Sequence, residues 1–371
     1  MANQSGDNIS LSAPASPPKH ILESAPGLTT EAKAVPDERL TTGPNYVTGV
    51  KLAVFVAAVA LASFLVLLDI MIVSTAIPRI TDTFHSLNDI GCSAPQLLTG
   101  RFYKYLNTKW TFMIFFIVFE IGSALCGAAV SSPMFIVGRF VAGFGAAGIS
   151  NGSVNIVSNC APLEKRPALI GLLIGFSLLG LVVGPLVGGA FTSLTTWRWC
   201  FYVNLPAGGV AAIPILFLNI PGDAGKPKLS TVVSKLYLYF DLTGFFLIAP
   251  AVLQLLLALQ FGGHTYPWNS SQVIGLFVGS FATAVVWFFW NRYRGEDAML
   301  PYSLVRRGDV LASGMYTALF MSAIFGATYF LPIYFQAVNG ASAKLSAVYL
   351  LPMILAQLFT AVAAGGAGKF H

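Results

Sequence analysis

Residues 52–68 read LAVFVAAVALASFLVLL, a run without a charged side chain in which Ser63 is the one polar residue. Residues 274–290, IGLFVGSFATAVVWFFW, form a second run of the same kind. A helix of about 20 residues, rising 1.5 Å per residue, crosses the hydrocarbon core of a bilayer. Uninterrupted apolar runs of this length therefore predict transmembrane helices.

The composition agrees with this interpretation. Of the 371 residues, 56% are hydrophobic and 10% are charged, whereas a typical soluble domain carries about 25% charged residues. The net charge of +6 does not indicate nucleic-acid binding, because the Lys and Arg residues lie between the apolar runs and form no single basic face. We expect lipid to surround the chain and no nucleic-acid partner.

Nine apolar blocks are candidate spans. They are centred near Val59, Val118, Gly145, Leu179, Val210, Ala251, Gly279, Met321 and Leu355. The fold class predicted is an all-α polytopic membrane protein. Residues 1–50 are rich in Ser, Pro, Ala, Gly and Thr and have no apolar stretch near Met1, which predicts a disordered cytosolic tail without a cleavable signal peptide.

Basic residues gather in loops that face the cytosol, and one segment breaks that rule. With a cytosolic tail, a single crossing places residues 100–110 outside, although this segment carries Arg101, Lys104 and Lys109. The later basic residues fall in alternate loops, as the rule requires. They are Lys165, Arg166, Lys226, Lys228, Lys235, Arg292, Arg294, Arg306 and Arg307. We infer that a second span is missing near residues 91–100; the alternative is a re-entrant or interfacial segment.

Three charged residues lie inside the predicted spans: Asp69, Glu120 and Arg139. Inserting a charged side chain at the centre of a span costs about 2.5–3.5 kcal/mol of free energy, so each of these residues is expected to have a compensating partner or a functional role. Asp69 lies roughly 27 Å along the helix from Lys51, and Arg139 lies at a comparable depth near the outer face. A carboxylate beside an Arg in a partly dry cavity can bind and release protons. The alternatives are a structural ion pair, and for Glu120 a hydrogen bond to a neighbouring helix.

Residues 180–189, GLVVGPLVGG, place Gly180, Gly184 and Gly188 four residues apart, with Gly189 following and Pro185 at the centre. Small residues at this spacing let a second helix approach closely, and the proline bends the helix there. The pattern predicts a close helix contact at a point of bending.

Enzyme and metal signatures are weak. Residues 148–152, GISNG, match the spelling of a nucleophile elbow but fall inside an apolar helix. The four cysteines are far apart and the histidines lie outside the spans, so we expect no metal and no cofactor. A membrane-embedded enzyme would need clustered acids or histidines, and Glu296, Asp297 and His264 form no known arrangement. Asn269 begins a glycosylation sequon in a loop that the charges place outside.

The chain resembles the major facilitator superfamily, in its fungal drug:proton antiporter group with fourteen spans. Four stretches carry the resemblance. They are residues 68–78 (LDIMIVSTAIP), Gly138-Arg139 with Gly143, residues 180–189, and residues 196–206 (TWRWCFYVNLP), the last being the most diagnostic. The resemblance implies proton coupling by Asp69 and Arg139 and an antiporter motif at residues 180–189. Residues 87–91 (LNDIG) lead in the family into a complete second span, and Lys104 stands where the family has an acid.

The resemblance implies an N-terminal bundle at residues 51–219, a linker with two spans at 220–309 and the start of a truncated C-terminal bundle at 310–371. The implied function is export of small lipophilic compounds, such as a drug, toxin or secondary metabolite, in exchange for protons. The plasma membrane is the expected location, with the vacuolar membrane as the alternative. Because alternating access needs two bundles, a non-transporting product, truncated or derived from an incorrect gene structure, stays open as the rival.

Overall fold

The computed structural model describes residues 49–84, 95–217, 226, 240–263, 265–341 and 343–367. The predicted tail, except for its last two residues, lies outside these ranges. Within them the regular structure is helical, apart from one isolated bridge between Gly262 and Tyr266. The all-α prediction is therefore confirmed for the described part of the chain.

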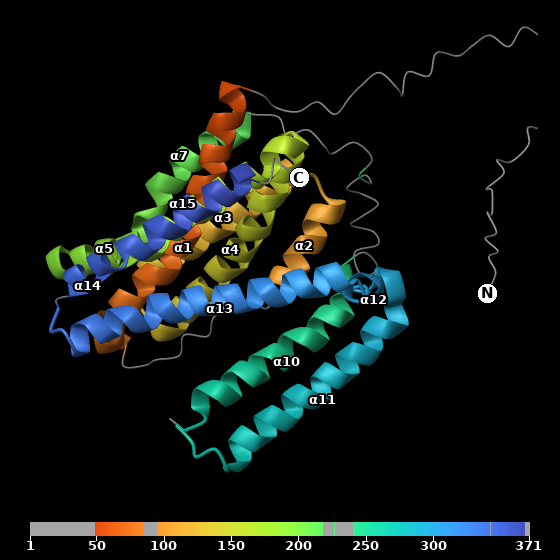
Figure 1. The fold of residues 1–371 in the computed structure, drawn as a ribbon. Coiled ribbons are helices and arrows are strands. Elements are labelled where there is room, and N and C mark those ends of the chain that lie inside the picture. The colour runs from red at the N-terminus through yellow and green to blue at the C-terminus, as the bar shows by residue number, and fades with distance from the viewer. Residues whose placement is uncertain are drawn as a thin grey trace, which may run out of the picture. The chain divides into compact units, whose positions relative to one another are not determined.

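The helices follow one another along the chain in the order shown in Figure 1. They are α1 (Val50–Phe84), α2 (Pro95–Tyr105), α3 (Thr108–Gly127), α4 (Ser132–Cys160), η1 (Leu163–Lys165), α5 (Arg166–Leu194), α6 (Trp199–Tyr202), α7 (Asn204–Phe217), α10 (Leu242–Phe261), α11 (Ser271–Arg294), η2 (Gly295–Asp297), α12 (Tyr302–Val305), α13 (Gly308–Ala337), α14 (Ala343–Tyr349) and α15 (Leu351–Ala367).

Side-chain caps explain where several of the helices begin. Asn107 accepts a hydrogen bond from the backbone N–H of Trp110 at the start of α3, and Ser131 accepts one from Met134 at the start of α4. Ser270 does the same for Val273 at the start of α11. Each cap satisfies a backbone donor that has no partner within the helix, so these polar residues separate apolar runs into distinct helices.

Eight helical stretches of the described chain are long and apolar enough to cross a membrane. They correspond to the predicted spans from the one centred near Val59 to the one centred near Met321. The ninth, centred near Leu355, is α15, whose 17 described residues fall short of the about 20 that a span needs. The 11-residue α2 lies where a second span was inferred to be missing; residues 85–94, which precede it, are outside the described part.

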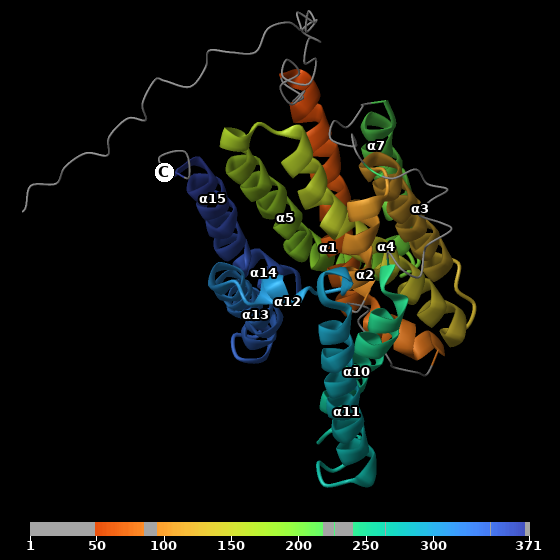
Figure 2. The ribbon, with the colours of Figure 1, turned by 90° about the vertical axis from the view of Figure 1, so that its right-hand side faces the viewer.

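The N-terminal helices pack side by side. α1 lies along α5, α3 lies along α4, and α7 contacts both α1 and α3 (Figures 1 and 2). Their largest buried cluster contains Phe55 and Val59 of α1 with Phe112, Phe116 and Phe119 of α3. This core holds α1, α3, α4 and α7 at fixed positions around one another.

The opposite side of α5 packs against the C-terminal helices. Leu178, Leu181 and Val182 form a buried cluster with Leu350, which directly precedes α15, and with Ile354 in its first turn. Helix α15 runs beside α5 in both ribbon views. Helix α5 therefore lies between α1 on one side and α14 and α15 on the other.

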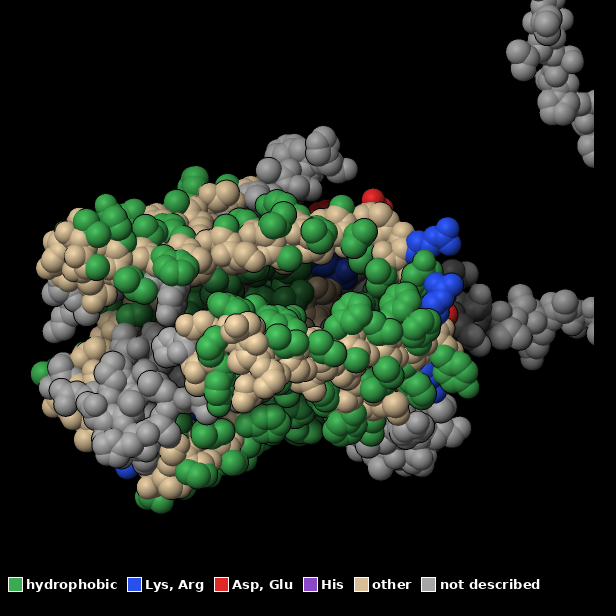
Figure 3. All heavy atoms as spheres, turned by 90° about the horizontal axis from the view of Figure 1, so that it is seen from below, with side chains coloured by type: hydrophobic (Ala, Val, Ile, Leu, Met, Phe, Trp, Pro, Cys, Tyr) green, Lys and Arg blue, Asp and Glu red, His purple; other side chains and the backbone are tan. Residues whose placement is uncertain are grey.

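Helices α10 and α11 form an antiparallel hairpin that starts at Asp241 and returns to Arg294. Large hydrophobic side chains on α10, α11 and α13 are exposed, among them Phe246, Phe281 and Tyr316. In the view of Figure 3 hydrophobic side chains cover much of the surface and Lys and Arg gather at one end. Such a surface suits lipid contact along the helices and polar contact at one end.

Candidate functional site

An ion pair joins α1 to α4. Nη1 of Arg139 lies 2.5 Å from Oδ2 of Asp69. Asp69 is 3% exposed, so its charge is compensated inside the protein and not by water. The structure thus brings together the two in-span charges whose depths were predicted to match.

Asn204, the first residue of α7, completes the surroundings of Asp69. Its Nδ2 donates to Oδ1 of Asp69 and to Oγ of Ser123, both at 3.3 Å. Asn204 and Ser123 are both fully buried, whereas Oδ1 of Asn204 has no hydrogen-bond partner. Four helices therefore meet at this polar cluster, which we call the Asp69 network: Asp69, Ser123, Arg139 and Asn204.

The residues before α7 fix the position of Asn204. Nη1 of Arg198 donates to the carbonyl of Gly127 at 3.1 Å and to that of Ala129 at 2.6 Å. These carbonyls lie at the end of α3, where a cation is favourable because the helix leaves carbonyls unpaired. The Trp197 ring stacks edge-on against Phe135 of α4. The stretch 196–206 thus anchors α7 to α3 and α4, and this positions the side-chain amide of Asn204 beside the carboxylate of Asp69.

The glycines of α5 contact α1 beside Asp69. A methyl group at Gly180 would lie 2.7 Å from the backbone nitrogen of Leu68, and one at Gly184 would lie 2.7 Å from Cβ of Met71. Gly188 is buried as well, but a methyl group at Gly189 would meet no atom within 4 Å. Pro185 lies inside the helix. The close approach predicted from the glycine spacing is therefore present at Gly180 and Gly184, and Gly189 takes no part in it.

Glu120 of α3 lies on the seam between α3 and α7, not in the ion pair. A side chain at Gly208 would collide with its Oε1. Both carboxylate oxygens are buried, and neither has a hydrogen-bond partner among the described residues. The hydrogen bond to a neighbouring helix, considered as its alternative role, is not formed.

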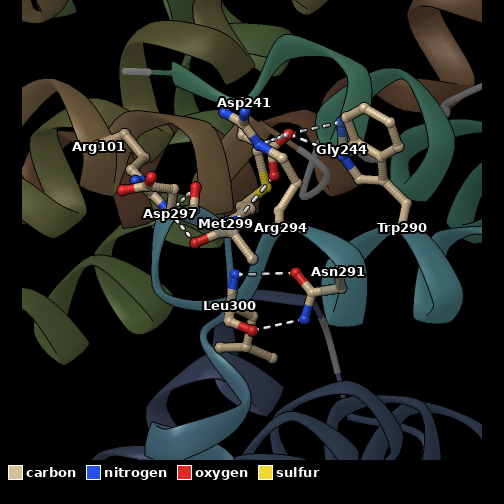
Figure 4. A network of polar contacts seen from close by, with 10 residues as sticks. Arg101, Asp241, Gly244, Trp290, Asn291, Arg294, Asp297, Met299 and Leu300 are labelled. Atoms are coloured by element: carbon tan, nitrogen blue, oxygen red, sulfur yellow. Dashed lines mark hydrogen bonds and ion pairs between the residues drawn. The ribbon is translucent and has the colours of Figure 1, made fainter. Parts of the chain in front are cut away.

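A second buried carboxylate, Asp241, organises the ends of α10 and α11 (Figure 4). Its Oδ1 accepts from the backbone N–H of Gly244 at 3.2 Å and from Nε1 of Trp290 at 2.9 Å. Its Oδ2 accepts from the N–H of Met299 at 2.9 Å, and Nε of Arg294 lies 3.9 Å from Oδ1. Sequence reasoning missed this residue because it stands just outside a span, where a carboxylate is ordinary.

Arg101 of α2 reaches the same region. It donates to the backbone carbonyls of Asp297 and Ala298 (Figure 4), and it is buried. The basic segment 100–110 is thereby tied to the loop after α11. Lys104, in contrast, is exposed and lies over the ring of Tyr105.

The remaining sequence candidates have simpler surroundings. Ser150 lies within α4 and donates to the carbonyl of Ala146, so residues 148–152 form no nucleophile elbow. Glu296 accepts from Ser303, and His264 is outside the described residues. Asn269 is exposed in the turn between α10 and α11.

Comparison with known proteins identifies the fold. The family model described as Major Facilitator Superfamily matches residues 59–370. The MFS-type transporter pigP of Monascus ruber is 52% identical over 89% of this chain, and the efflux pump mokI of Monascus pilosus is 45% identical over 86%. The chain spans 60% and 62% of these two relatives.

Among solved structures, the proton:xylose symporter XylE matches 85% of this chain and 68% of its own, with a TM-score of 0.50 and 15% identity. That likeness concerns the fold alone. Together with the family match over most of the sequence, it agrees with the helical architecture described above. The relatives and the fold are those of transporters and not of enzymes, and the chain belongs to the major facilitator superfamily.

Proposed function

We propose that the protein is a secondary active transporter that exports small lipophilic compounds in exchange for protons, in the plasma membrane or alternatively the vacuolar membrane. The observation that carries the proposal is the Asp69 network: a buried carboxylate inside a span, held by one cation and one amide. Relatives named as an MFS-type transporter and an efflux pump support the direction of transport.

The network suits a proton-binding step. When Asp69 takes up a proton, its attraction to Arg139 falls, because only the ionised carboxylate forms the 2.5 Å ion pair. The side chain of Arg139 is 22% exposed, so water can compensate part of its charge when the ion pair is lost. The contact between α1 and α4 weakens on protonation and re-forms on release, which couples proton occupancy to helix position.

The glycines of α5 place this step beside a helix seam. Gly180 and Gly184 lie against residues 64–72 of α1. Because the two helices touch there, a movement of α1 around Asp69 displaces α5. The other face of α5 contacts α14 and α15. In this proposal α5 transmits the movement between the N-terminal helices and the C-terminal ones, as rocking of one bundle against another requires.

Glu120 is proposed as an auxiliary group in proton coupling. It lies one helical turn from Ser123 on α3, and the hydroxyl of Ser123 belongs to the Asp69 network. Two nearby carboxylates disfavour being ionised together. Occupancy of one by a proton therefore changes the proton affinity of the other.

The test is dye efflux from sealed vesicles containing the purified chain, with and without an imposed proton gradient. We expect gradient-dependent efflux in the wild type and its loss in Asp69→Asn, which preserves shape and removes the titrating carboxylate. Asp309→Asn, which changes an exposed carboxylate at the start of α13, is the matched control. Efflux that persists after the gradient is dissipated would contradict the proposal, and no efflux above empty vesicles would favour the non-transporting alternative.

A further inference from the structure

The side-chain amide of Asn204 forms hydrogen bonds at one end only. Its Nδ2 donates to Oδ1 of Asp69 and to Oγ of Ser123, each at 3.3 Å. Its Oδ1 has no hydrogen-bond partner among the residues that the structure describes. Asn204 is 0% exposed, and a buried acceptor without a donor is unfavourable. The unpartnered oxygen therefore needs an explanation.

The surroundings of Asp69 suit its ionised form. The ionised carboxylate only accepts hydrogen bonds, whereas the protonated acid also carries an O–H group that must donate. Arg139, which lies 2.5 Å from Oδ2 of Asp69, has donors and no acceptor. The group of Asn204 that faces Oδ1 of Asp69 is likewise a donor. A proton bound at Asp69 therefore needs an acceptor that the amide, as it is oriented here, does not provide.

Rotation of the Asn204 amide by half a turn about its Cβ–Cγ bond supplies that acceptor. The nitrogen and the oxygen exchange places, so Oδ1 comes within hydrogen-bond distance of Asp69 and Ser123, where Nδ2 lies now. This torsion is broad and roughly two-fold. A serine hydroxyl can donate as well as accept, so both contacts form again with donor and acceptor exchanged. The unpartnered oxygen becomes the acceptor for the proton of Asp69.

The backbone beside Asn204 is held in place while the amide turns. Trp197 and Phe201, which precede α7, belong to one buried cluster with Leu68 of α1, and Leu68 directly precedes Asp69. Buried apolar side chains are closely packed and resist displacement. A change of charge at Asp69 is therefore met by rotation of a side chain, without movement of the start of α7.

We infer that Asn204 is a positioning residue for proton exchange at Asp69: its Nδ2 donates to the ionised carboxylate, and its Oδ1 accepts from the protonated one. A hydronium ion gives one proton to Oδ1 of Asp69 and leaves as water, and the amide then turns to accept the new O–H group. The inference rests on the proposed function for its use in transport, but the exchange itself requires no transported compound.

The elements packed around Asp69 carry further charged or titratable groups. They are Arg139 of α4, Glu120 and Cys126 of α3, Arg198 directly before α6, and Cys200 of α6. Among these groups, within the described part of the chain, Arg139 alone is bound to the carboxylate of Asp69. The amide of Asn204 is thus the one neighbouring group bound there that can serve both protonation states.

Infrared difference spectroscopy of the purified chain in lipid, in acidic minus neutral buffer, tests the inference without a transported compound. Asp69 is followed through the C=O band of its protonated carboxyl group, which Asp69→Asn must abolish. Asn204 is followed through its side-chain carbonyl band after labelling of asparagine with a heavy carbon isotope. We expect the Asn204 band to move to lower frequency as the Asp69 band appears, because the carbonyl then accepts a hydrogen bond. This movement should be absent in Asp69→Asn.

Two leucine variants sharpen the test. Asn204→Leu keeps a similar volume without the amide, so the labelled band should be lost and the Asp69 band should move to higher frequency, because the protonated carboxyl group has lost its acceptor. Asn155→Leu is the matched control and should leave both bands in place. Asn155 lies about 24 Å along α4 from Arg139 and accepts from Asn159. The comparison of wild type with Asp69→Asn stands even if Asn204→Leu does not fold.

The outcomes separate this inference from the proposed function. An Asn204 band that stays fixed while Asp69 becomes protonated would overturn the inference and leave proton-driven export standing. If Asp69 shows no protonated band in any buffer in which the chain stays folded, both are overturned. A band shift as expected, in a chain that shows no gradient-driven efflux, supports the inference and contradicts the proposed function alone.

Discussion

Two buried aspartates, Asp69 and Asp241, are surrounded in different ways. Asp241 accepts hydrogen bonds from two backbone N–H groups and an indole, and Arg294 lies 3.9 Å away. Among the described residues, Asp69 accepts from Arg139 and Asn204 alone. Asp241 is 1% exposed and Asp69 is 3% exposed, so the two residues do not differ in burial. They differ in the number and kind of their hydrogen-bond donors.

The difference indicates which carboxylate is held by fixed donors and which by donors that can move. The backbone donors around Asp241 hold its carboxylate in one position, because they cannot move away without unwinding the start of α10 or the loop after α11. The donors to Asp69 are side chains on α4 and α7, which can rotate or shift with their helices. We interpret Asp241 as a clamp and Asp69 as a group able to exchange its partner.

The largest expected effect is on the ion pair. Arg139→Ala leaves Asp69 buried with Asn204 as its one remaining donor among the described residues, and breaking a buried pair in this way costs about 3–5 kcal/mol. The measurement is the free energy of unfolding in mixed micelles, by denaturant titration. Arg294→Ala serves as the comparison, with an expected loss of about 1 kcal/mol, since Asp241 keeps its three hydrogen bonds. Equal losses would remove the distinction between clamp and exchangeable group.

The next effect concerns the clamp itself. Asp241→Ala removes the cap of α10 and the acceptor for Trp290 and Met299, and we expect a loss of about 2–3 kcal/mol, confined to the ends of α10 and α11. Hydrogen exchange of the Met299 amide should accelerate, because that amide loses its acceptor. Unchanged protection at Met299 would show that Asp241 does not hold the loop.

A smaller effect is expected at the α1–α5 seam. Gly180→Ala places a methyl group 2.7 Å from the backbone nitrogen of Leu68, and such overpacking costs about 1–3 kcal/mol. Gly189→Ala on the same helix meets no atom within 4 Å and should instead stabilise the helix by up to about 1 kcal/mol. Thermal unfolding of the two variants gives opposite signs if the seam is as close as described, and the same sign if it is not.

The sequence predicted those parts of the site in which a residue type is unfavourable or unusual inside a membrane span. Asp69 and Arg139 stand out because a charge inside a span requires a partner, and the glycine spacing showed where α5 approaches another helix. Asn204 and Ser123 were missed, because an amide or hydroxyl in a span is common and gives no comparable signal. Asn204 lay within the diagnostic stretch 196–206, but nothing in that stretch indicated that its amide would reach α1.

Asp241 was missed for a different reason. Two of its donors, the indole of Trp290 and the N–H of Met299, come from residues 49 and 58 positions later, and such pairings arise only when α10 and α11 fold back on one another. The hairpin was predictable from two adjacent apolar runs, but the register that brings Trp290 and Met299 to Asp241 depends on packing. Local sequence patterns do not contain that information.

The smallest effect on stability is expected at Asn269. Whether this residue carries a glycan indicates on which side of the membrane Asp241 and Asp69 lie. Asn269 lies in the turn between α10 and α11, at the end of the hairpin opposite Asp241. Because it is exposed and distant from both networks, Asn269→Gln should change the unfolding free energy by no more than about 0.5 kcal/mol.

A glycan, detected as a mobility shift that endoglycosidase removes and that Asn269→Gln abolishes, would place this turn on the lumenal or external side. Asp241 would then lie near the cytosolic face, whereas Asp69, about 29 Å along α1 from Val50, would lie toward the outer face. The opposite result would be the absence of a glycan together with labelling, by a thiol reagent in the cytosol, of a cysteine introduced at position 269. That result would reverse the orientation, and Asp241 could no longer be assigned to the cytosolic face.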